Sequence, residues 1–321
     1  MTAVLEVRNL KTYFFSEEGV VKAVDDVSFT VNQGKTLGLV GESGCGKSVT
    51  AMSIAQLVSP PGKIVGGQIL LNGRDLLSLS EQQMRQTRGA QLSMVFQEPM
   101  TALNPVLQIG FQIAEAVLAH EKVSKQEAWS RAVDAMKVVS IPDPEKRARD
   151  YPHHLSGGMR QRIMIAIALV CRPMLMIADE PTTALDVTIQ AQILELLESL
   201  REQYRLSLIL ISHDLGVIAE VAETVAVMYA GKIVEIGPAM DIFHNPKHPY
   251  TEGLLRSVPH LGSSGQNKGR LSAIEGMVPD LVDLPHGCSF APRCYKKTVE
   301  CTQSAIELET RHKVGVRCIH A

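Results

Sequence analysis

The segment from Gly41 to Ser48, GESGCGKS, constrains this chain more than any other part of its sequence. Its glycines let successive backbone N–H groups turn toward one point, and a helix that starts there adds its positive end. Lys47 can reach the β- and γ-phosphates of a nucleotide, and Ser48 can bind Mg²⁺. The apolar run 37–40 predicts a strand before the loop and 48–57 a helix after it. The pattern predicts ATP binding, with a glycine-rich turn that carries a chance Lys-Ser pair as the alternative.

Two adjacent carboxylates, Asp179 and Glu180, end a second apolar run at Met174–Ala178. Ligands bind outside the carboxyl ends of strands in open α/β sheets. We expect Asp179 to hold Mg²⁺ through water and Glu180 to activate the attacking water as a general base. A solvated acidic turn is the alternative for such a pair.

Two further polar residues, Gln97 and His213, follow the predicted strands LSMVF and SLILIS. The neutral amide of Gln97 can bind Mg²⁺ and orient water without adding charge. For His213 an ordinary surface or capping histidine is the alternative. We expect both to converge with Asp179 and Glu180 on one site, because the ends of parallel strands meet at one edge of a sheet.

The rest of the chain predicts an α/β protein with a helical insertion. Alternating runs at 4–10 and 27–31 predict a pair of antiparallel strands. Between Pro99 and Asp150 the pattern becomes helical, with Ser124 and Glu127 as a capping box. From about residue 245 proline, glycine, histidine and finally cysteine dominate, which predicts a small appended domain.

Composition excludes several classes of protein. A net charge of −2 leaves no basic surplus for a nucleic-acid backbone, so no nucleic-acid partner is expected. The apolar runs are far shorter than a bilayer crossing requires. The N-terminus MTAVLEVRNL has no secretory pattern, so we expect a cytoplasmic protein whose cysteines form no structural disulfides.

The segment LSGGMRQR, residues 155–162, decides among nucleotide-binding folds. Ser156 can cap a helix whose first turn, opened by Gly157 and Gly158, allows close approach of a phosphate. With Gly41–Ser48, Gln97, Asp179–Glu180, the ALD segment at 184–186 and His213 in this order, the sequence resembles an ABC-family ATPase over roughly residues 3–245. The resemblance implies a RecA-like parallel core, an antiparallel β subdomain and an α-helical subdomain inserted at about 99–155.

The resemblance also implies that two cassettes pair head to tail, so that Ser156 and Gly158 of one face the phosphate loop of the other. Asp186 would lie in the loop that communicates across the interface. Tyr13 or Phe14 would stack on adenine, and strand packing is the alternative for each. Glu180, His213 and Gln97 are the expected catalytic residues; Ser48, Gln97 and Asp179 would bind Mg²⁺. The residues expected to contact nucleotide are Tyr13, Phe14, Gly41, Glu42, Ser43, Gly44, Cys45, Gly46, Lys47, Ser48, Val49, Gln97, Ser156, Gly157, Gly158, Asp179 and Asp186.

Further segments narrow the resemblance to the ATPase subunits of dipeptide and oligopeptide importers: FQEPMTALNP, YPHHLSGGMRQR, NPKHPYTEGLL and GCSFAPRC. It implies a cassette at 1–245 and a C-terminal extension at 246–321. The implied partners are a second, different ATPase subunit, two permease subunits and an extracytoplasmic peptide-binding protein, with this chain on the cytoplasmic face of the inner membrane. Pro99–Ala116 would help to receive the permease. An importer ATPase for nickel or another small solute, and a non-transport ABC ATPase, are the alternatives.

Four cysteines, Cys288, Cys294, Cys301 and Cys318, are spaced C-x5-C-x6-C-x16-C. Zinc sites usually contain a C-x2–4-C knuckle, absent here, whereas iron–sulfur clusters accept wider spacings. The importer resemblance implies a 4Fe–4S cluster with these cysteines as ligands; zinc, and four unrelated thiols, are the alternatives.

Overall fold

The computed structural model describes residues 2–183, 185–257 and 274–321. The chain divides into two compact units. The first comprises Met1–Leu5, Val31–Lys35 and Leu71–Ile211, and the second comprises Glu6–Thr30, Thr36–Leu70 and Ser212–Ala321.

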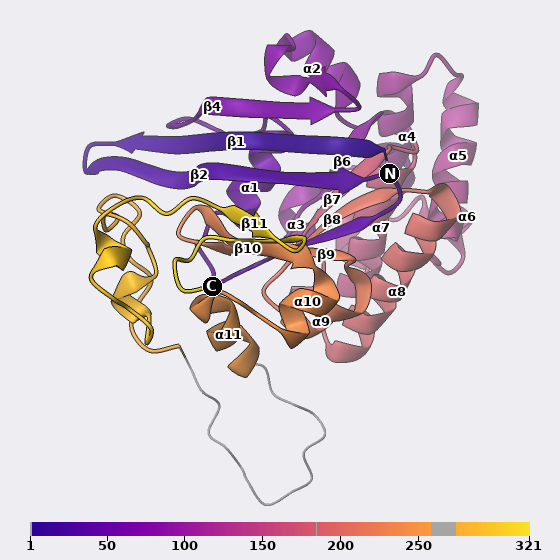
Figure 1. Cartoon of the computed structure of the whole chain (residues 1–321). Coiled ribbons are helices and arrows are strands. Elements are labelled where there is room, and N and C mark those ends of the chain that lie inside the picture. The colour runs from indigo at the N-terminus through magenta and orange to yellow at the C-terminus, as the bar shows by residue number, and fades with distance from the viewer. Residues whose placement is uncertain (1, 184, 258–273) are drawn as a thin grey trace, which may run out of the picture. The chain divides into compact units, whose positions relative to one another are not determined.

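The first unit is built on parallel strands in the order β8–β7–β6, drawn in Figure 1. They are β6 (Leu92–Val95), β7 (Leu175–Asp179) and β8 (Ser207–Ser212). Leu92 pairs with Leu175 and Asp179 with Ile211. Every residue of β7 and β8 is buried, as expected for parallel strands covered on both faces. Both strands were predicted from their apolar runs.

Helices make up most of the remaining first unit, and α4, α5 and α7 pack against one another (Figure 1). The Ser124 hydroxyl accepts a 3.1 Å hydrogen bond from the Glu127 N–H, one of the two bonds of the predicted capping box. The helical character predicted between Pro99 and Asp150 is confirmed. The elements are β5 (Arg74–Asp75), η1 (Leu76–Ser78), α2 (Glu81–Thr87), α3 (Pro99–Ala102), α4 (Ile109–His120), α5 (Lys125–Val138), α6 (Pro144–Arg147), η2 (Pro152–His154), α7 (Gly157–Leu169) and α8 (Val187–Tyr204).

The second unit contains most of an antiparallel layer in the order β2–β1–β4 (Figure 1). Its strands are β1 (Ala3–Ser16), β2 (Gly19–Asn32) and β4 (Gly62–Leu71). The predicted N-terminal pair is confirmed, and both strands are longer than their apolar runs indicated. Hydrogen bonding along the strands continues through polar residues that no hydrophobic pattern marks.

The second unit also contains a mixed sheet in the order β11–β12–β10–β9–β3, together with several helices. Strand β3 (Thr36–Val40) runs parallel to β9 (Thr224–Tyr229), and β10 (Lys232–Pro238) is antiparallel to β9. The C-terminal strands β11 (Glu309–Arg311) and β12 (Val314–Val316) continue this sheet beyond β10. A boundary at residue 245 stays a prediction. The helices are α1 (Lys47–Ile54), α9 (Leu215–Val221), α10 (Ala239–His244), α11 (Pro249–Arg256), η3 (Ala291–Arg293) and η4 (Glu300–Thr302).

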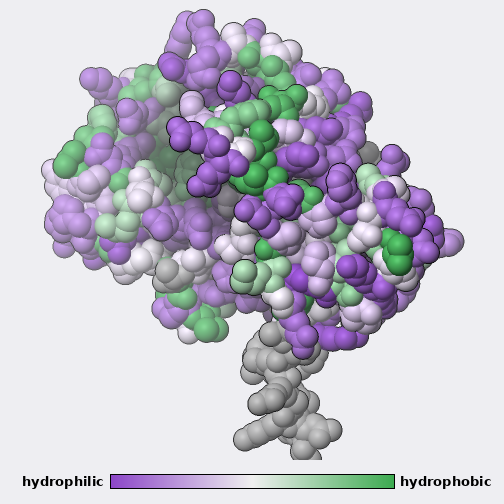
Figure 2. Space-filling model, turned by 90° about the vertical axis from the view of Figure 1, so that its left-hand side faces the viewer, coloured by the Kyte–Doolittle hydropathy of each residue, from purple (hydrophilic) through white to green (hydrophobic). Residues whose placement is uncertain are grey.

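The surface carries mainly hydrophilic side chains on the face seen in Figure 2, with hydrophobic ones gathered in smaller groups among them. Within the described ranges, no helix has both the length and the apolar character that a bilayer crossing needs.

Candidate nucleotide site

The phosphate loop joins β3 to α1 in the second unit, and its glycines are required by its backbone. Gly41, Gly44 and Gly46 have φ values of 150°, 77° and 105°. A Cβ on Gly41 would lie 2.2 Å from the Met228 carbonyl oxygen, and one on Gly46 would lie 2.2 Å from that of Ala23. Glycine therefore provides both the backbone conformation and the room for β9 and β2 to approach the loop.

Helix α1 begins directly at Lys47, which is 5% exposed. Its N-cap, Gly46, supplies no side-chain hydrogen bond. The Lys47 Nζ donates to the carbonyl oxygens of Gly41 (2.8 Å) and Glu42 (3.0 Å), so the ammonium group lies inside the curve of the loop. Half-buried Ser48 follows in the first turn of the helix. A helix start without a side-chain cap, next to a lysine, is suited to an anion such as phosphate.

Glu42, in the same loop, is held by residues that the sequence did not point to. The Arg293 guanidinium donates to both carboxylate oxygens of Glu42, at 2.7 and 3.1 Å. The Glu42 N–H donates to the Tyr250 hydroxyl at 2.8 Å. Burial raises the pKa of the Cys45 thiol in this loop, which fits a small packed side chain rather than a reactive thiolate.

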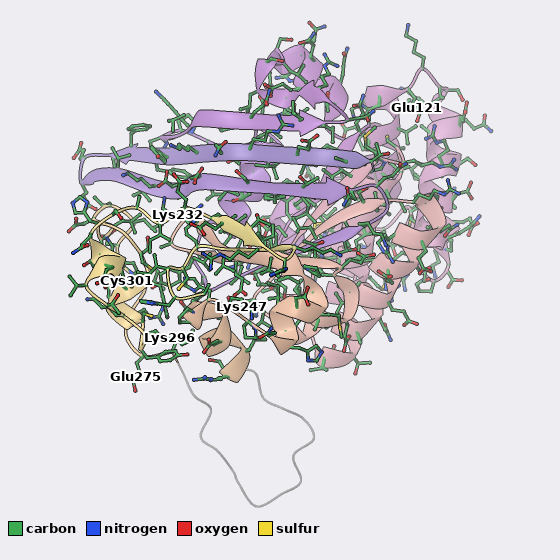
Figure 3. The ribbon with its side chains drawn as sticks, in the orientation of Figure 1. Glu121, Lys232, Lys247, Glu275, Lys296 and Cys301 are labelled. Carbon is green, nitrogen blue, oxygen red and sulfur yellow. The ribbon has the colours of Figure 1, made fainter. Side chains whose placement is uncertain are left out.

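The two adenine-stacking candidates lie on β1, in the second unit. The Tyr13 hydroxyl donates to Asp25 at 2.8 Å, and Asp25 also accepts from Lys232 at 2.7 Å (Lys232 is labelled in Figure 3). Burial and the bond to Asp25 raise the pKa of Tyr13. Thr12 bonds Ser53 of α1 at 2.7 Å. Side chains alternate along a strand, so Phe14 is on the face of β1 that Thr12 turns toward α1, and Tyr13 is on the other.

Glu180 and Gln97, both in the first unit, come together as predicted for two of the catalytic candidates. The Gln97 Nε2 donates to the Glu180 carboxylate at 3.2 Å, and the Thr183 hydroxyl donates to it at 2.9 Å. Asp179 is the buried last residue of β7. Glu180 has a left-handed φ of 46°, and its N–H donates to the Ile211 carbonyl of β8 at 3.0 Å. Thr183 was missed, because a threonine in a turn carries no signal of its own.

The LSGG segment starts α7 in the first unit. The Ser156 hydroxyl accepts from the Met159 N–H at 3.3 Å, which confirms it as the N-cap. A Cβ on Gly158 would lie 2.7 Å from Cγ2 of Ile189, so this glycine also lets α7 pack against α8. Asp186 caps α8 by accepting from the Ile189 N–H at 3.0 Å. Ala184, the first residue of the ALD segment, lies outside the described residues.

His213 is an exposed residue of the second unit, between β8 and α9. The neighbouring Asp214 caps α9 by accepting from the Gly216 N–H at 2.8 Å. Because His213 and Lys47 belong to the second unit and Glu180 to the first, the convergence of the strand ends on one site stays a prediction.

The four predicted cluster cysteines lie in the segment that contains Cys301 (Figure 3). Burial raises the pKa of the Cys288 thiol to about 11, with smaller contributions from Cys318, Cys294 and Cys301. The Cys301 Sγ lies 3.5 Å from Nε2 of His320. In the described part of the chain, however, no group of three or more His, Cys, Asp or Glu side chains is arranged to hold a metal ion. The side chains as positioned do not fit a closed cluster site, and the prediction of a cysteine-cluster domain is not supported.

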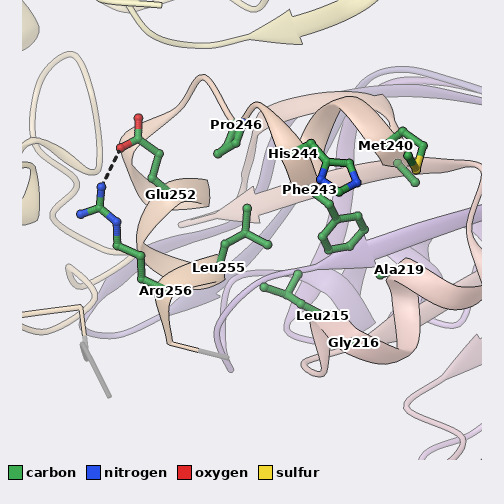
Figure 4. A pocket seen from close by; sticks show the side chains of 11 residues that line it. Leu215, Gly216, Ala219, Met240, Phe243, His244, Pro246, Glu252, Leu255 and Arg256 are labelled. Carbon is green, nitrogen blue, oxygen red and sulfur yellow. Dashed lines mark hydrogen bonds and ion pairs between the residues drawn. The ribbon is translucent and has the colours of Figure 1, made fainter. Parts of the chain in front are cut away.

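A separate apolar cavity of about 670 Å³ lies between α9, α10 and α11 in the second unit (Figure 4). Leu215, Phe243 and Leu255 line it, and the ion pair between Glu252 and Arg256, 3.5 Å long, closes one side. No nucleotide-site candidate lines this cavity.

Comparison with known proteins decides the family. The family described as ABC transporter matches residues 24–183. The dipeptide transport ATP-binding protein of Bacillus subtilis is 54% identical over 302 residues, covering 94% of this chain and 89% of that protein. This chain belongs to the ATP-binding proteins of ABC transporters. It is an ABC ATPase.

Three further matches cover all or part of this ABC ATPase. The oligopeptide transport ATP-binding protein of the same organism is 52% identical and covers 99% of this chain and 97% of that protein. A bacterial ABC transporter cassette solved as a dimer aligns with a TM-score of 0.66 and 25% identity, over 73% of this chain and 98% of its own. The family described as the C-terminal region of oligopeptide and dipeptide transporters matches residues 234–301. The predicted ABC cassette fold is confirmed.

Proposed function

We propose that this ABC ATPase powers a membrane importer for dipeptides or oligopeptides. The observation that carries the proposal is its similarity to peptide transport ATP-binding proteins, which includes the oligopeptide and dipeptide transporter region at residues 234–301. Nickel or another small solute is the alternative cargo.

The nucleotide site is proposed to use the residues predicted from the sequence. Lys47 and the N–H groups at the start of α1 would hold the β- and γ-phosphates. The oxygen donors of Ser48, Gln97 and Asp179 suit Mg²⁺, which neutralises phosphate charge when bound. The Glu180 carboxylate would orient and deprotonate the attacking water, and its bonds to Gln97 and Thr183 would fix its direction. His213 would complete the catalytic set.

Phe14, rather than Tyr13, is our proposed partner for adenine. It is on the same face of β1 as Thr12, which bonds α1, the helix that follows the phosphate loop. The Tyr13 hydroxyl is committed to Asp25 on the other face. We expect Phe14→Ala to weaken ATP binding about tenfold, in line with one lost stacking contact, and Tyr13→Phe to leave it unchanged. The reverse ranking would overturn this choice.

The assembly is proposed to pair this chain head to tail with a second, different ATPase subunit, beneath two permease subunits and an extracytoplasmic peptide-binding protein. Ser156, Gly157, Gly158 and Asp186 would then contact the nucleotide or the interface of the partner cassette. The location that follows is the cytoplasmic face of the inner membrane.

A 4Fe–4S cluster remains our proposal for the cysteine segment, with zinc as the alternative. The proposal rests on the donor set, four cysteines at positions 288, 294, 301 and 318, and not on the side-chain positions, which form no metal site within the described residues. The full chain purified without oxygen should contain iron and sulfide and show a visible absorption band that bleaches on reduction. Colourless protein with stoichiometric zinc would overturn it.

Two experiments test the function. Glu180→Gln in the reconstituted complex should bind ATP normally and lose turnover by about 10²–10³-fold, because the general base is gone. Turnover near the wild-type rate would remove Glu180 from its role. For the cargo, vesicles that contain the complex should accumulate labelled dipeptide only with ATP, and uptake of nickel alone would favour the alternative.

A further inference from the structure

We propose that the C-terminal extension is a working part of the ATP site: Arg293 and Tyr250 are positioning residues that hold the phosphate loop through Glu42. This inference rests on the proposed function only in that the loop binds ATP. All the contacts that carry it lie within the second unit.

Arg293 is fixed on every side. Its side chain is 4% exposed and makes the bidentate ion pair with Glu42 at 2.7 and 3.1 Å. Its remaining N–H groups donate to the carbonyl oxygens of Glu275 (3.0 Å) and Ile274 (3.1 Å) and to the Tyr229 hydroxyl (3.4 Å). A buried guanidinium with both its carboxylate and its carbonyl partners in place can adopt a single orientation, and a planar fork of this kind fixes the carboxylate as well.

Tyr250 supplies a second, independent contact. The fully buried ring packs against Tyr229, with centroids 4.6 Å apart, and its hydroxyl accepts from the Glu42 N–H. The turn before it is anchored on β10, because the buried Glu235 carboxylate accepts from the N–H groups of Lys247 (2.7 Å) and His248 (3.0 Å). Glu42 is thus held at its side chain by one residue of the extension and at its backbone by another.

Glu42, the residue that Arg293 and Tyr250 hold, is in direct contact with Lys47 of the phosphate loop. Lys47 donates to the carbonyls of Gly41 and Glu42, so the backbone that Arg293 and Tyr250 hold is the backbone that positions the lysine. If these contacts are lost, ordering of the loop must accompany ATP binding, which weakens binding without touching the chemical step. The expected signature is a higher Kd and KM for ATP with nearly unchanged kcat.

A double-mutant cycle on the full chain tests this. Arg293→Met and Glu42→Gln should each raise the Kd for a fluorescent ATP analogue about tenfold, and the double variant should be no worse than either single one. The matched control is Arg311→Met, which breaks an exposed ion pair with Glu309 elsewhere in the extension and should leave the Kd unchanged. Additive effects, or a Kd unchanged in both single variants, would overturn the proposal.

Two further measurements distinguish a positioning role from misfolding and from a failure of the proposed function. Tyr250→Phe removes only one hydroxyl and should raise the Kd a few-fold with only a small fall in Tm. This variant tests the proposal if Arg293→Met does not fold. In the assembled transporter, Arg293→Met should raise the KM for ATP and spare kcat, whereas a fall in kcat alone would count against positioning. Failure of the wild-type chain to bind ATP would sink the proposed function itself, while normal wild-type binding with unaffected variants would sink only this inference.

Discussion

The first turns of α1 and α7 are both predicted to contact phosphate, but the N-termini of these two helices are stabilised in different ways. At α7 the Ser156 hydroxyl caps the first turn, and the contacts come from residues nearby in the sequence. At α1 the cap is a left-handed glycine without a side-chain bond, and the loop is held by Arg293 and Tyr250 from far along the chain. A loop that must leave its own N–H groups for a ligand needs support from elsewhere, whereas a locally capped helix does not.

Gly46→Ala changes the N-cap of α1 and should have the largest effect on ATP binding. A left-handed alanine costs roughly 1–3 kcal/mol, and its Cβ would also lie 2.2 Å from the Ala23 carbonyl oxygen. We expect affinity for ATP to fall by about a hundredfold in equilibrium titrations. The control is Gly73→Ala, where φ is 79° but nothing lies within 4 Å of the Cβ, and where ATP binding should be unchanged. Equal losses in both variants would contradict the loop-specific explanation.

Low pH should weaken the contacts that hold the phosphate loop before α1 more than it weakens the N-cap of α7. His248 accepts from the Tyr250 N–H through Nδ1, and burial lowers its pKa to about 3. Below a pH of about 6.5 the unfolded chain takes up a proton at this histidine and the folded chain does not. The free energy of unfolding therefore decreases as the pH decreases. Between pH of about 7 and about 5 the loss is about 2 kcal/mol.

His248→Asn keeps an acceptor for Tyr250 but cannot titrate, so its stability should fall less steeply over this range. Denaturant unfolding of both proteins at each pH measures the difference. Burial raises the pKa of Glu235, which acts in the opposite direction, but this contribution is common to both proteins and cancels. Parallel pH profiles would show that His248 is not responsible.

Ser156→Ala tests the local cap. Loss of a serine N-cap costs about 1 kcal/mol, so we expect amide hydrogen exchange at Met159 to accelerate about fivefold. Ser156→Thr retains the hydroxyl and should keep most of the protection. ATP binding by the isolated chain should be the same in both, since this helix is proposed to serve the partner's nucleotide; weakened binding in the alanine variant alone would contradict that assignment.

Gly157→Ala should have the smallest effect on stability, and unlike the other variants it should stabilise the isolated chain. The new Cβ would lie at an ordinary 3.5 Å from Leu185 Cδ2, and alanine favours a helix over glycine by about 0.5–1 kcal/mol. We expect the isolated chain to become slightly more stable in thermal unfolding. ATP turnover by the assembled transporter should fall, because in the proposed head-to-tail pair the methyl group would meet the partner's phosphate. A loss of stability would mean that the turn is more constrained than its backbone indicates.

The sequence was informative where chemistry or periodicity is local. The buried strands β3, β7 and β8 follow from short apolar runs, and the Ser124 and Ser156 caps follow from residue type and position. Gln97 and Glu180 were predicted to meet because both follow parallel strands, and they do. Arg293 and Tyr250 were not predicted, because an arginine in a proline-rich segment and a tyrosine at a helix start have no pattern that names a partner so distant in the chain. The cysteines were grouped by their spacing and by the importer resemblance, and neither determines where the thiols point.

The ion pair between Glu42 and Arg293 joins residues 251 positions apart, which also sets an order of events during synthesis. At roughly 5–20 residues per second, a ribosome needs roughly 12–50 seconds to travel from one to the other. Throughout that interval the nascent chain carries a complete GESGCGKS loop without its arginine. With Arg293 in its proposed role, full ATP-binding strength is acquired only after residue 293 has been added, and a product truncated before it keeps the motif but lacks the residue that holds it.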